Sequence, residues 1–250
     1  DAEGDVLDPL GGGLADLKAR RIRFIGDARQ RLREDFLRIL RFFRFHAQFG
    51  ITPLDTEGLS ACLAERGGLE VISAERIGAE MKKLLAAPDP GPALQAMGPI
   101  LTDILPGAFW TGDLLEAEAD WRLAPDPIRR LASLNATQFD RLRLSKAETA
   151  RLDAITTCQT LSLDEAVYRH GADAAIDALA IHGVPYTDQS RSIARAESAG
   201  FPVSASDLMD RGMTPGPDLG AALKSLEARW ISEGFAPTRE ALLSTLEKGA

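Results

Sequence analysis

The 250-residue sequence predicts a mainly α-helical fold, in which several helical segments follow a small residual β edge at the N-terminus. Apolar residues recur at helical spacing almost throughout the chain from Ala28 onward. Gly and Pro interrupt these stretches where helix ends are expected. Two Ser-x-x-Glu patterns, Ser145 to Glu148 and Ser162 to Glu165, are typical of helix N-termini, because each side chain can satisfy a backbone N–H of the other residue.

Residues 1–28 predict the edge of a β-sheet. Ile22 and Phe24 alternate with arginines, which is the pattern of a half-buried strand. One or two short strands cannot form an independent domain, so we expect this segment to be the end of a preceding domain. The glycines at 11–13 lack the Lys and the Ser or Thr of a phosphate-binding P-loop, and they therefore predict a tight turn.

Residues 29–92 predict a helical domain that closes at a Pro-rich boundary. The first helix is expected over 29–49, because five apolar residues recur there at helical spacing. These residues are Leu32, Phe36, Ile39, Leu40 and Phe43. A second helix is expected around 59–64. Ser73 is the predicted N-cap of a third helix, which should end before Pro88.

Residues 93–200 predict a compact helical body, and residues 201–250 predict a helical tail. A tail helix over 219–231 carries apolar residues that could face either RNA or the body. These residues are Leu219, Leu223, Leu226 and Trp230. A last helix should begin near Thr238. The larger aromatic residues of both segments could stack on RNA bases, but their helical spacing favours packing roles. They are Phe109, Trp110, Trp121, Tyr168 and Trp230.

The charge distribution indicates one localised anion site. The net charge of -8, taken alone, argues against a protein whose whole surface binds nucleic acid. Residues 18–44, however, hold ten Lys or Arg against three acidic residues. A basic segment within an acidic chain suits phosphates or a stretch of RNA backbone. The acidic character beyond residue 45 predicts RNA binding of modest affinity that depends on shape.

Several other classes of function are excluded by the residue types present. Cys62 and Cys158 lie far apart in the sequence, so we expect two buried thiols rather than a disulfide or a zinc site. His46, His170 and His182 show no metal-ligand spacing, and no metal site is predicted. No signal-like N-terminus and no run of about 18 uncharged apolar residues occurs, so we expect a cytoplasmic protein with no membrane partner.

The candidate site consists of Asp35, Arg38, Arg41 and Arg44, which are spaced three residues apart on the first expected helix. At about 1.5 Å of rise per residue, Arg44 would lie about 13.5 Å beyond Asp35, which is the length of a nucleotide from base edge to outer phosphates. A carboxylate beside a guanidinium complements the amino group and ring nitrogen of adenine or cytosine. Guanine and uracil would instead place a carbonyl against the carboxylate and an N–H against the guanidinium, so that acceptor faces acceptor and donor faces donor. The next two arginines could hold phosphates.

The alternative interpretation of the same spacing is purely structural. An amphipathic helix with a solvated basic face, and with a contact between Asp35 and Arg38 inside the helix, would show the same pattern. Periodicity by itself does not separate the two interpretations.

A motif resemblance favours the nucleotide-binding interpretation. Glu34-Asp35-Phe-Leu-Arg38 resembles the E-D-x-x-R motif of the bacterial and eukaryotic class of CCA-adding enzymes and of bacterial poly(A) polymerases. Residues 8–17 resemble the Gly-rich turn and Asp-Leu pair that end the catalytic head of that family. Residues 73–85 resemble its next neck motif, and 207–235 resemble its tail.

The resemblance implies a role for each segment. Residues 1–28 would be the residual end of a nucleotidyltransferase head, 29–92 a neck that selects the base, 93–200 a helical body and 201–250 a tail. In the neck, the implied nucleotide-binding residues are Asp35, Arg38, Arg41 and Arg44, of which the first two read ATP and CTP. The implied structural neck motif is Glu34, Arg76 and Glu80.

The implied reaction is the addition of CCA to tRNA 3′ ends from CTP and ATP. The implied partner is the 3′ end and acceptor/elbow region of tRNA, of which the tail grips the elbow. In this family, Asp-x-Asp carboxylates hold Mg²⁺, and they act with a Gly-Gly-x-x-Arg-Asp loop and an Arg-Arg-Asp motif; none of these occurs in the chain. We therefore assign no catalytic residue, and we expect part of a longer enzyme that is inactive alone.

Two other functions stay open. The first is a poly(A) polymerase that adds AMP to RNA 3′ ends, which the acidic tail disfavours. The second is a non-catalytic helical module that binds RNA or protein.

Overall fold

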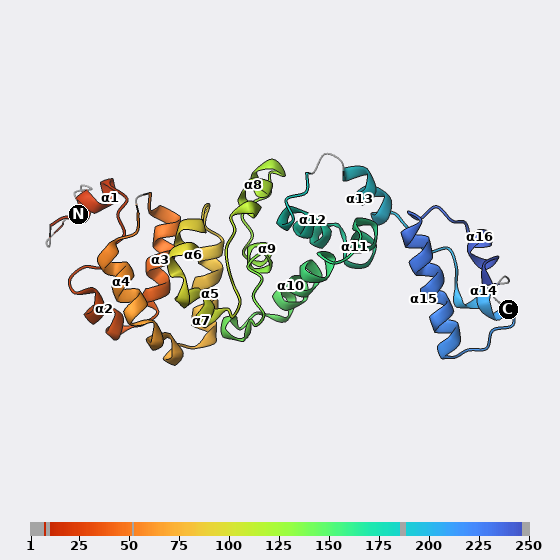
Figure 1. Ribbon diagram of the computed structural model, residues 1–250, viewed down its shortest axis with the longest axis horizontal. Coiled ribbons are helices and arrows are strands. Elements are labelled where there is room, and N and C mark those ends of the chain that lie inside the picture. Colours follow the sequence, from red (N-terminus) through yellow and green to blue (C-terminus); the bar gives the residue numbers. More distant parts are fainter. Residues whose placement is uncertain (1–7, 9–10, 52, 186–188, 247–250) are drawn as a thin grey trace, which may run out of the picture. The chain divides into compact units, whose positions relative to one another are not determined.

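The fold of the described residues is helical, as the sequence predicts. The computed structural model describes residues 8, 11–51, 53–185 and 189–246, and these residues form helices and loops with no strand (Figure 1). The chain divides into two compact units, Asp1–Asp153 with Ala180–Val184, and Ala154–Leu179 with Pro185–Ala250. The boundary between the units falls inside the predicted body, and the division into four segments stays a prediction.

The first unit is built around α3, α5 and α6, which lie side by side (Figure 1). Its helices are α1 (Gly13–Lys18), α2 (Ala28–Glu34), α3 (Arg38–Phe49), α4 (Thr56–Ala64), α5 (Ala74–Leu85), α6 (Gly91–Met97), α7 (Pro99–Ile104), α8 (Asp113–Asp120), α9 (Pro127–Ala132) and the start of α10 (Lys146–Cys158), with the 3-10 helices η1 (Arg66–Val71) and η2 (Asp140–Leu142). Leu40, Phe43, Ile77 and Met81 are fully buried between α3 and α5.

The second unit has its own apolar core. Its helices are the end of α10, α11 (Leu163–His170), most of α12 (Ala172–Ile181), α13 (Ser190–Glu197), α14 (Ala205–Met209), α15 (Pro217–Ser232) and α16 (Arg239–Leu243). Leu219, Leu226 and Trp230 of α15 are buried in this core, and the Trp230 ring meets Tyr168 of α11 edge-on at 5.7 Å. Of the two orientations open for α15, the apolar face therefore packs toward the protein and not toward RNA.

The predicted β edge is not shown by the residues that the structure describes. Residues 21–24 form no strand, and no partner strand exists in the described part of the chain to pair with them. Phe24 is held instead by its ring, which stacks on Phe42 with 5.4 Å between the ring centroids. Residues 1–7 of the predicted edge lie outside the described residues. The predicted tight turn is present, with Gly11 and Gly12 at positive φ.

The single helix expected over 29–49 is wrong, because the chain breaks into α2 and α3. Asp35 is extended, with φ -157° and ψ 103°, and its side chain accepts a hydrogen bond from the Leu37 N–H at 3.2 Å. Asp side chains that bond to nearby backbone N–H groups compete with helix formation. The apolar periodicity continues across the break, since Leu32 and Ile39 are both buried, and this explains the misreading.

Helices begin at the predicted N-caps, although Ser73 at the start of α5 makes no side-chain capping hydrogen bond. Ser145 and Glu148 exchange reciprocal side-chain to backbone hydrogen bonds of 2.8 and 3.2 Å. Ser162 caps α11 by accepting from the Glu165 N–H at 3.3 Å, but the Glu165 carboxylate pairs with Arg169 instead of completing the box. These caps satisfy backbone N–H groups that a helix start would otherwise leave without a partner.

A buried ionic cluster joins α8 and α9 to the end of α5. Glu118 accepts hydrogen bonds from Arg129 at 2.8 Å and from Arg130 at 2.6 Å, and all three side chains are buried. The Arg130 guanidinium also donates to the backbone carbonyls of Leu85, at 2.6 Å, and Ala87. Because the last carbonyls of a helix have no partner within the helix, Arg130 satisfies the C-terminal end of α5.

Candidate functional site

The break between α2 and α3 positions the first candidate residue. Asp35 is the C-cap of α2, and Arg76 of α5 donates from one guanidinium nitrogen to both Asp35 oxygens, at 3.1 and 3.2 Å. Together with the bond from the Leu37 N–H, this contact fixes the carboxylate while leaving it partly exposed. Arg76 thus connects α5 to the break between α2 and α3. Arg76 is also one of the residues that the resemblance assigns to the structural neck motif.

Arg38 lies at the same turn but has different partners. Its guanidinium donates to the Glu34 carboxylate at 2.6 Å and to the Arg31 carbonyl at 2.7 Å, while its backbone N–H donates to the Asp35 carbonyl at 3.0 Å. The hydrogen bonds from Arg38 and Arg31 lower the pKa of Glu34 below its ordinary value. The contact between the Asp35 and Arg38 side chains, expected under the structural alternative, is therefore replaced by two separate ion pairs.

The other two candidate arginines converge on Glu80 of α5. Arg44 donates from Nε to the Glu80 carboxylate at 2.7 Å, and the Arg41 Nε lies 3.5 Å from the other oxygen. Glu80 and Arg44 are largely buried, whereas Arg41 is more exposed. Arg44 also lies over the Phe45 ring, 4.2 Å from its centroid. Arg44 is thus committed to the contact between α3 and α5, and Arg41 is the freer group for an anion.

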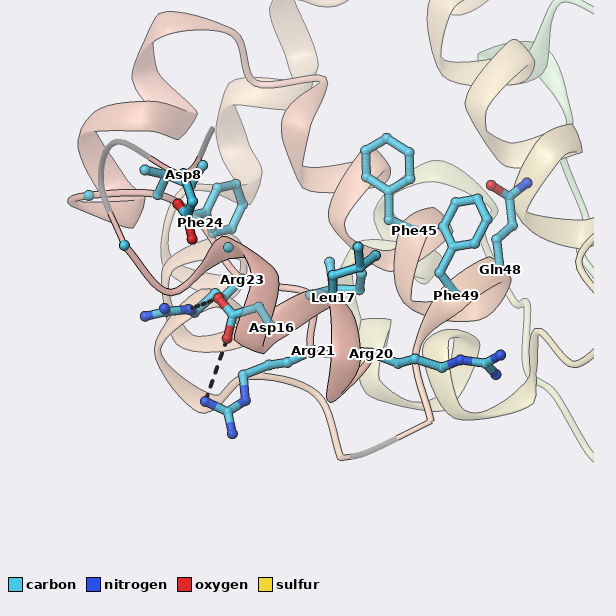
Figure 2. A pocket seen from close by; sticks show the side chains of 15 residues that line it. Asp8, Asp16, Leu17, Arg20, Arg21, Arg23, Phe24, Phe45, Gln48 and Phe49 are labelled. Atoms are coloured by element: carbon cyan, nitrogen blue, oxygen red, sulfur yellow. Dashed lines mark hydrogen bonds and ion pairs between the residues drawn. The ribbon is translucent and has the colours of Figure 1, made fainter. Parts of the chain in front are cut away.

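A cleft of about 1060 Å³ lies beside the C-terminal half of α3, and Figure 2 shows it from close by. Phe45 and Phe49 line it from α3, with 6.2 Å between their ring centroids, and Leu17 lines it from α1. Leu17 is 72% exposed and Phe49 57%. Arg20 and Arg21 also line it, and their side chains point in opposite directions (Figure 2). A surface that combines aromatic rings with guanidinium groups suits a ligand with a flat ring and an anionic group.

One acidic residue organises the charges of this cleft. Asp16 accepts a 2.5 Å hydrogen bond from Arg23 and lies 3.7 Å from Arg21 (Figure 2). The Asp16 carboxylate raises the pKa of Arg23 above its ordinary value. The sequence prediction missed this cleft. The spacing of Phe45 and Phe49 by four residues on one helix, next to the basic segment, was the signal that could have found it.

The described residues contain no group of three or more His, Cys, Asp or Glu placed to hold a metal ion. Cys62 and Cys158 are free and buried, as predicted, and burial raises the pKa of the Cys62 thiol to about 12. Burial also lowers the pKa of His46. No helix in the described ranges is long and apolar enough to cross a membrane.

The packing roles predicted for the large aromatic residues hold for Trp121, Trp230 and Tyr168, of which the last packs against the core of the second unit. Trp121 and Trp230 are buried, and the Trp121 indole donates to the Val184 carbonyl at 2.9 Å. Phe109, in contrast, is 53% exposed, so the packing role predicted for it is wrong.

Comparison with known proteins defines the class to which this helical chain belongs. No protein-family model matches it. The CCA-adding enzyme of Levilactobacillus brevis is 31% identical over 284 residues, which cover 98% of this chain and 68% of that enzyme. The mitochondrial CCA tRNA nucleotidyltransferase 1 of Danio rerio is 31% identical over 275 residues, which cover 94% of this chain and 61% of that protein.

The chain belongs to the family of CCA-adding tRNA nucleotidyltransferases, as the E-D-x-x-R motif predicts. It spans between about three fifths and two thirds of the length of these two relatives. Solved structures share the fold. A CCA-adding enzyme in complex with ATP superposes with a TM-score of 0.62 at 16% identity, covering 96% of this chain and 66% of that one. The Thermotoga maritima CCA-adding enzyme complexed with tRNA gives 0.58 at 16% identity, covering 95% and 66%.

Proposed function

We propose that this chain supplies base selection and RNA docking for a tRNA nucleotidyltransferase that adds CCA to tRNA 3′ ends from CTP and ATP. The observation that carries the proposal is the turn between α2 and α3. There, a carboxylate and a guanidinium three residues apart, whose backbones are joined by a hydrogen bond, are each held by a separate partner, Arg76 for Asp35 and Glu34 for Arg38. Membership of the CCA-adding family supports it.

The two side chains would read the base edge. Asp35 would accept a hydrogen bond from the amino group of adenine or cytosine, and Arg38 would donate to the neighbouring ring nitrogen. Guanine and uracil would place a carbonyl against the carboxylate and an N–H against the guanidinium, at a cost of about 1–3 kcal/mol for each unpaired group. Arg76 and Glu34 would hold both side chains before the nucleotide arrives, which lowers the entropy lost on binding.

The other neck residues would have supporting roles. Arg41, which is partly exposed, would contact the ribose or phosphates. Arg44 would stay near the nucleotide as a brace, because Glu80 holds its guanidinium between α3 and α5. Glu34, Arg76 and Glu80 would form the structural neck motif.

The described residues do not fit a magnesium site. They contain no cluster of three possible metal ligands, and the carboxylates of the turn are each paired with an arginine. The Mg²⁺ that nucleotidyl transfer requires would therefore be held by a catalytic head outside these residues. It follows from the proposal that the chain alone binds and selects but does not transfer.

The segments would divide the work. In this proposal, 1–28 is the end of the head, 29–92 the neck, 93–200 the body and 201–250 a tail that grips the tRNA elbow. A solved relative is complexed with tRNA, and other relatives with ATP or CTP, which supports these partners. The cytoplasmic location stays a prediction.

The test is incorporation of each labelled nucleoside triphosphate into tRNA that lacks its CCA end, by the full-length protein. Addition of two C and one A supports the proposal. Long tracts of A would identify a poly(A) polymerase instead. No incorporation at all would favour a non-catalytic helical module that binds RNA or protein.

A further inference from the structure

We propose that Gly68 is a positioning residue for the base-reading turn. Gly68 lies in η1, far from Asp35 and Arg38 in sequence, and has no side chain to contact a nucleotide. Its lack of a Cβ lets the Phe36 ring lie directly against the η1 backbone, and this contact sets where Asp35 and Arg38 stand. The inference rests on the proposed function, because it concerns how the base-reading site is held.

The contact between Phe36 and Gly68 leaves no room for another atom. A Cβ built on Gly68 would lie 2.1 Å from Phe36 Cδ1, 2.3 Å from Cγ and 2.4 Å from Cε1. Carbon atoms that are not bonded prefer separations of about 3.5–4.0 Å, so one partner would have to move by more than 1 Å. Cγ is the root of the ring, so rotation of the ring about its own axis would not relieve the overlap.

The η1 side of this contact is the fixed one. The Arg141 guanidinium donates to the Leu69 carbonyl at 2.7 Å, and Leu69 itself is buried. On the N-terminal side, the Gly68 N–H itself donates to the Glu65 carbonyl at 2.9 Å. Because these contacts hold η1 on both sides of Gly68, the displacement would fall on Phe36.

Movement of Phe36 would also displace Asp35 and Arg38, because all three residues belong to the same turn. Phe36 lies between Asp35 and Leu37, whose backbone N–H donates to the Asp35 carboxylate at 3.2 Å. The Phe36 carbonyl accepts from the Ile39 N–H at 3.0 Å, and the Asp35 carbonyl accepts from the Arg38 N–H at 3.0 Å. The ring is therefore attached to the same turn that orients both base-reading side chains.

The neighbouring glycine provides a matched control. A Cβ on Gly67 would meet no heavy atom within 4 Å, because Gly67 borders a separate cleft of about 540 Å³. Gly67→Ala and Gly68→Ala thus make the same chemical change in the same 3-10 helix. They differ in whether the added methyl group meets Phe36.

The experiment measures kcat and KM of the full-length protein for CTP, ATP, GTP and UTP on tRNA lacking CCA. For Gly68→Ala, we expect kcat/KM for CTP and ATP to fall by about 10- to 100-fold, the cost of misplacing contact groups by about 1 Å. GTP and UTP should be affected less, so the selectivity ratio should fall. Gly67→Ala should retain the wild-type ratio. In a Phe36→Ala background, Gly68→Ala should have little further effect on it.

Each outcome decides the inference. Equal selectivity of Gly67→Ala and Gly68→Ala, with an active wild-type protein, overturns the inference and leaves the proposed function standing. A uniform loss for all four nucleotides, with a lower melting temperature, shows a purely structural role and also overturns it. A wild-type protein that adds neither C nor A removes the proposed function, and the inference falls with it.

Discussion

Two carboxylate–guanidinium arrangements in the first unit differ sharply in their surroundings. In the turn between α2 and α3, Asp35 and Arg76 form a pair whose side chains are 26% and 48% exposed. In the cluster between α8 and α9, Glu118 and Arg130 are 5% and 1% exposed. Of these two carboxylate–guanidinium pairs, solvent and ligands can therefore reach the pair at the turn, whereas they cannot reach the pair in the buried cluster.

The difference shows which of the two can form a site. In the buried cluster, the Arg130 guanidinium is divided among Glu118 and the carbonyls that end α5. Those contacts cannot be exchanged without leaving a buried charge unpaired. In the exposed turn, water can replace any lost contact, and an exposed pair contributes only about 0–1 kcal/mol. The turn can therefore bind a ligand at little cost to the fold.

The largest expected effect comes from removing the acid of the buried cluster. Glu118→Ala leaves Arg129 and Arg130 buried without their carboxylate, and we expect the free energy of unfolding to fall by about 3–5 kcal/mol. Chemical denaturation of the chain measures it. The matched control is Asp103→Ala, which breaks an exposed pair with Arg66 and should cost less than about 1 kcal/mol. Equal costs would contradict the comparison.

A second prediction concerns packing near the buried region. A Cβ on Gly78 of α5 would lie 1.9 Å from the Leu142 carbonyl oxygen of η2. Gly78→Ala should therefore lower the free energy of unfolding by about 1–3 kcal/mol, the usual cost of overpacking. Gly220 lies inside α15, where a Cβ meets nothing within 4 Å. Gly220→Ala should stabilise its own unit by up to about 1 kcal/mol, and a loss of stability there would argue against the steric explanation.

The third prediction is a pH dependence. Glu148 at the start of α10 accepts a 2.6 Å hydrogen bond from Lys82 of α5, and the pKa of Glu148 is lowered from 4.5 to about 2, first by this bond and then by the Ser145 N–H. A carboxyl group whose pKa is lower in the folded state stabilises the fold above its unfolded pKa. The wild-type protein should thus lose its advantage over Glu148→Gln as the pH falls from about 4.5 to 2. A constant difference between the two across that range would refute the assignment.

The smallest expected effect on stability is at the turn itself. Asp35→Ala and Arg76→Ala should each change the free energy of unfolding by no more than about 1 kcal/mol, since both side chains are partly exposed. Thermal or chemical denaturation checks this. A loss as large as that of Glu118→Ala would mean that the turn is a structural element and not an exchangeable site.

The helical fold could be predicted from the sequence, and Asp35 and Arg38 could be singled out as candidate residues. The break in the helix at which they lie could not be predicted. Apolar periodicity located α3 and α5 because their buried faces repeat at helical spacing. It could not reveal the break at Asp35, since Leu32 and Ile39 stay in phase across it. That break depends on an Asp side chain bonding to a backbone N–H two residues further on, which competes with a helix only in the right tertiary setting.

The residues that contact the site residues could not be predicted from the sequence either. Asp35 pairs with Arg76 across 41 positions, and Phe36 packs against Gly68. Such contacts come from the packing of α5 and η1 on the turn, which no local pattern encodes. The strand predicted around Ile22 is not shown for a related reason, because a strand needs a partner that the described residues do not supply.

The most direct test of the central claim compares nucleotide selection by the full-length wild-type protein with that of Asp35→Ala and Arg38→Ala. Lys146→Ala, which removes an exposed cation of the same unit, serves as the control. We expect both turn variants to lose discrimination against GTP and UTP on tRNA lacking CCA, while the control keeps it. Variants that still add only C and A with wild-type selectivity would contradict the assignment of the turn as the base-reading site.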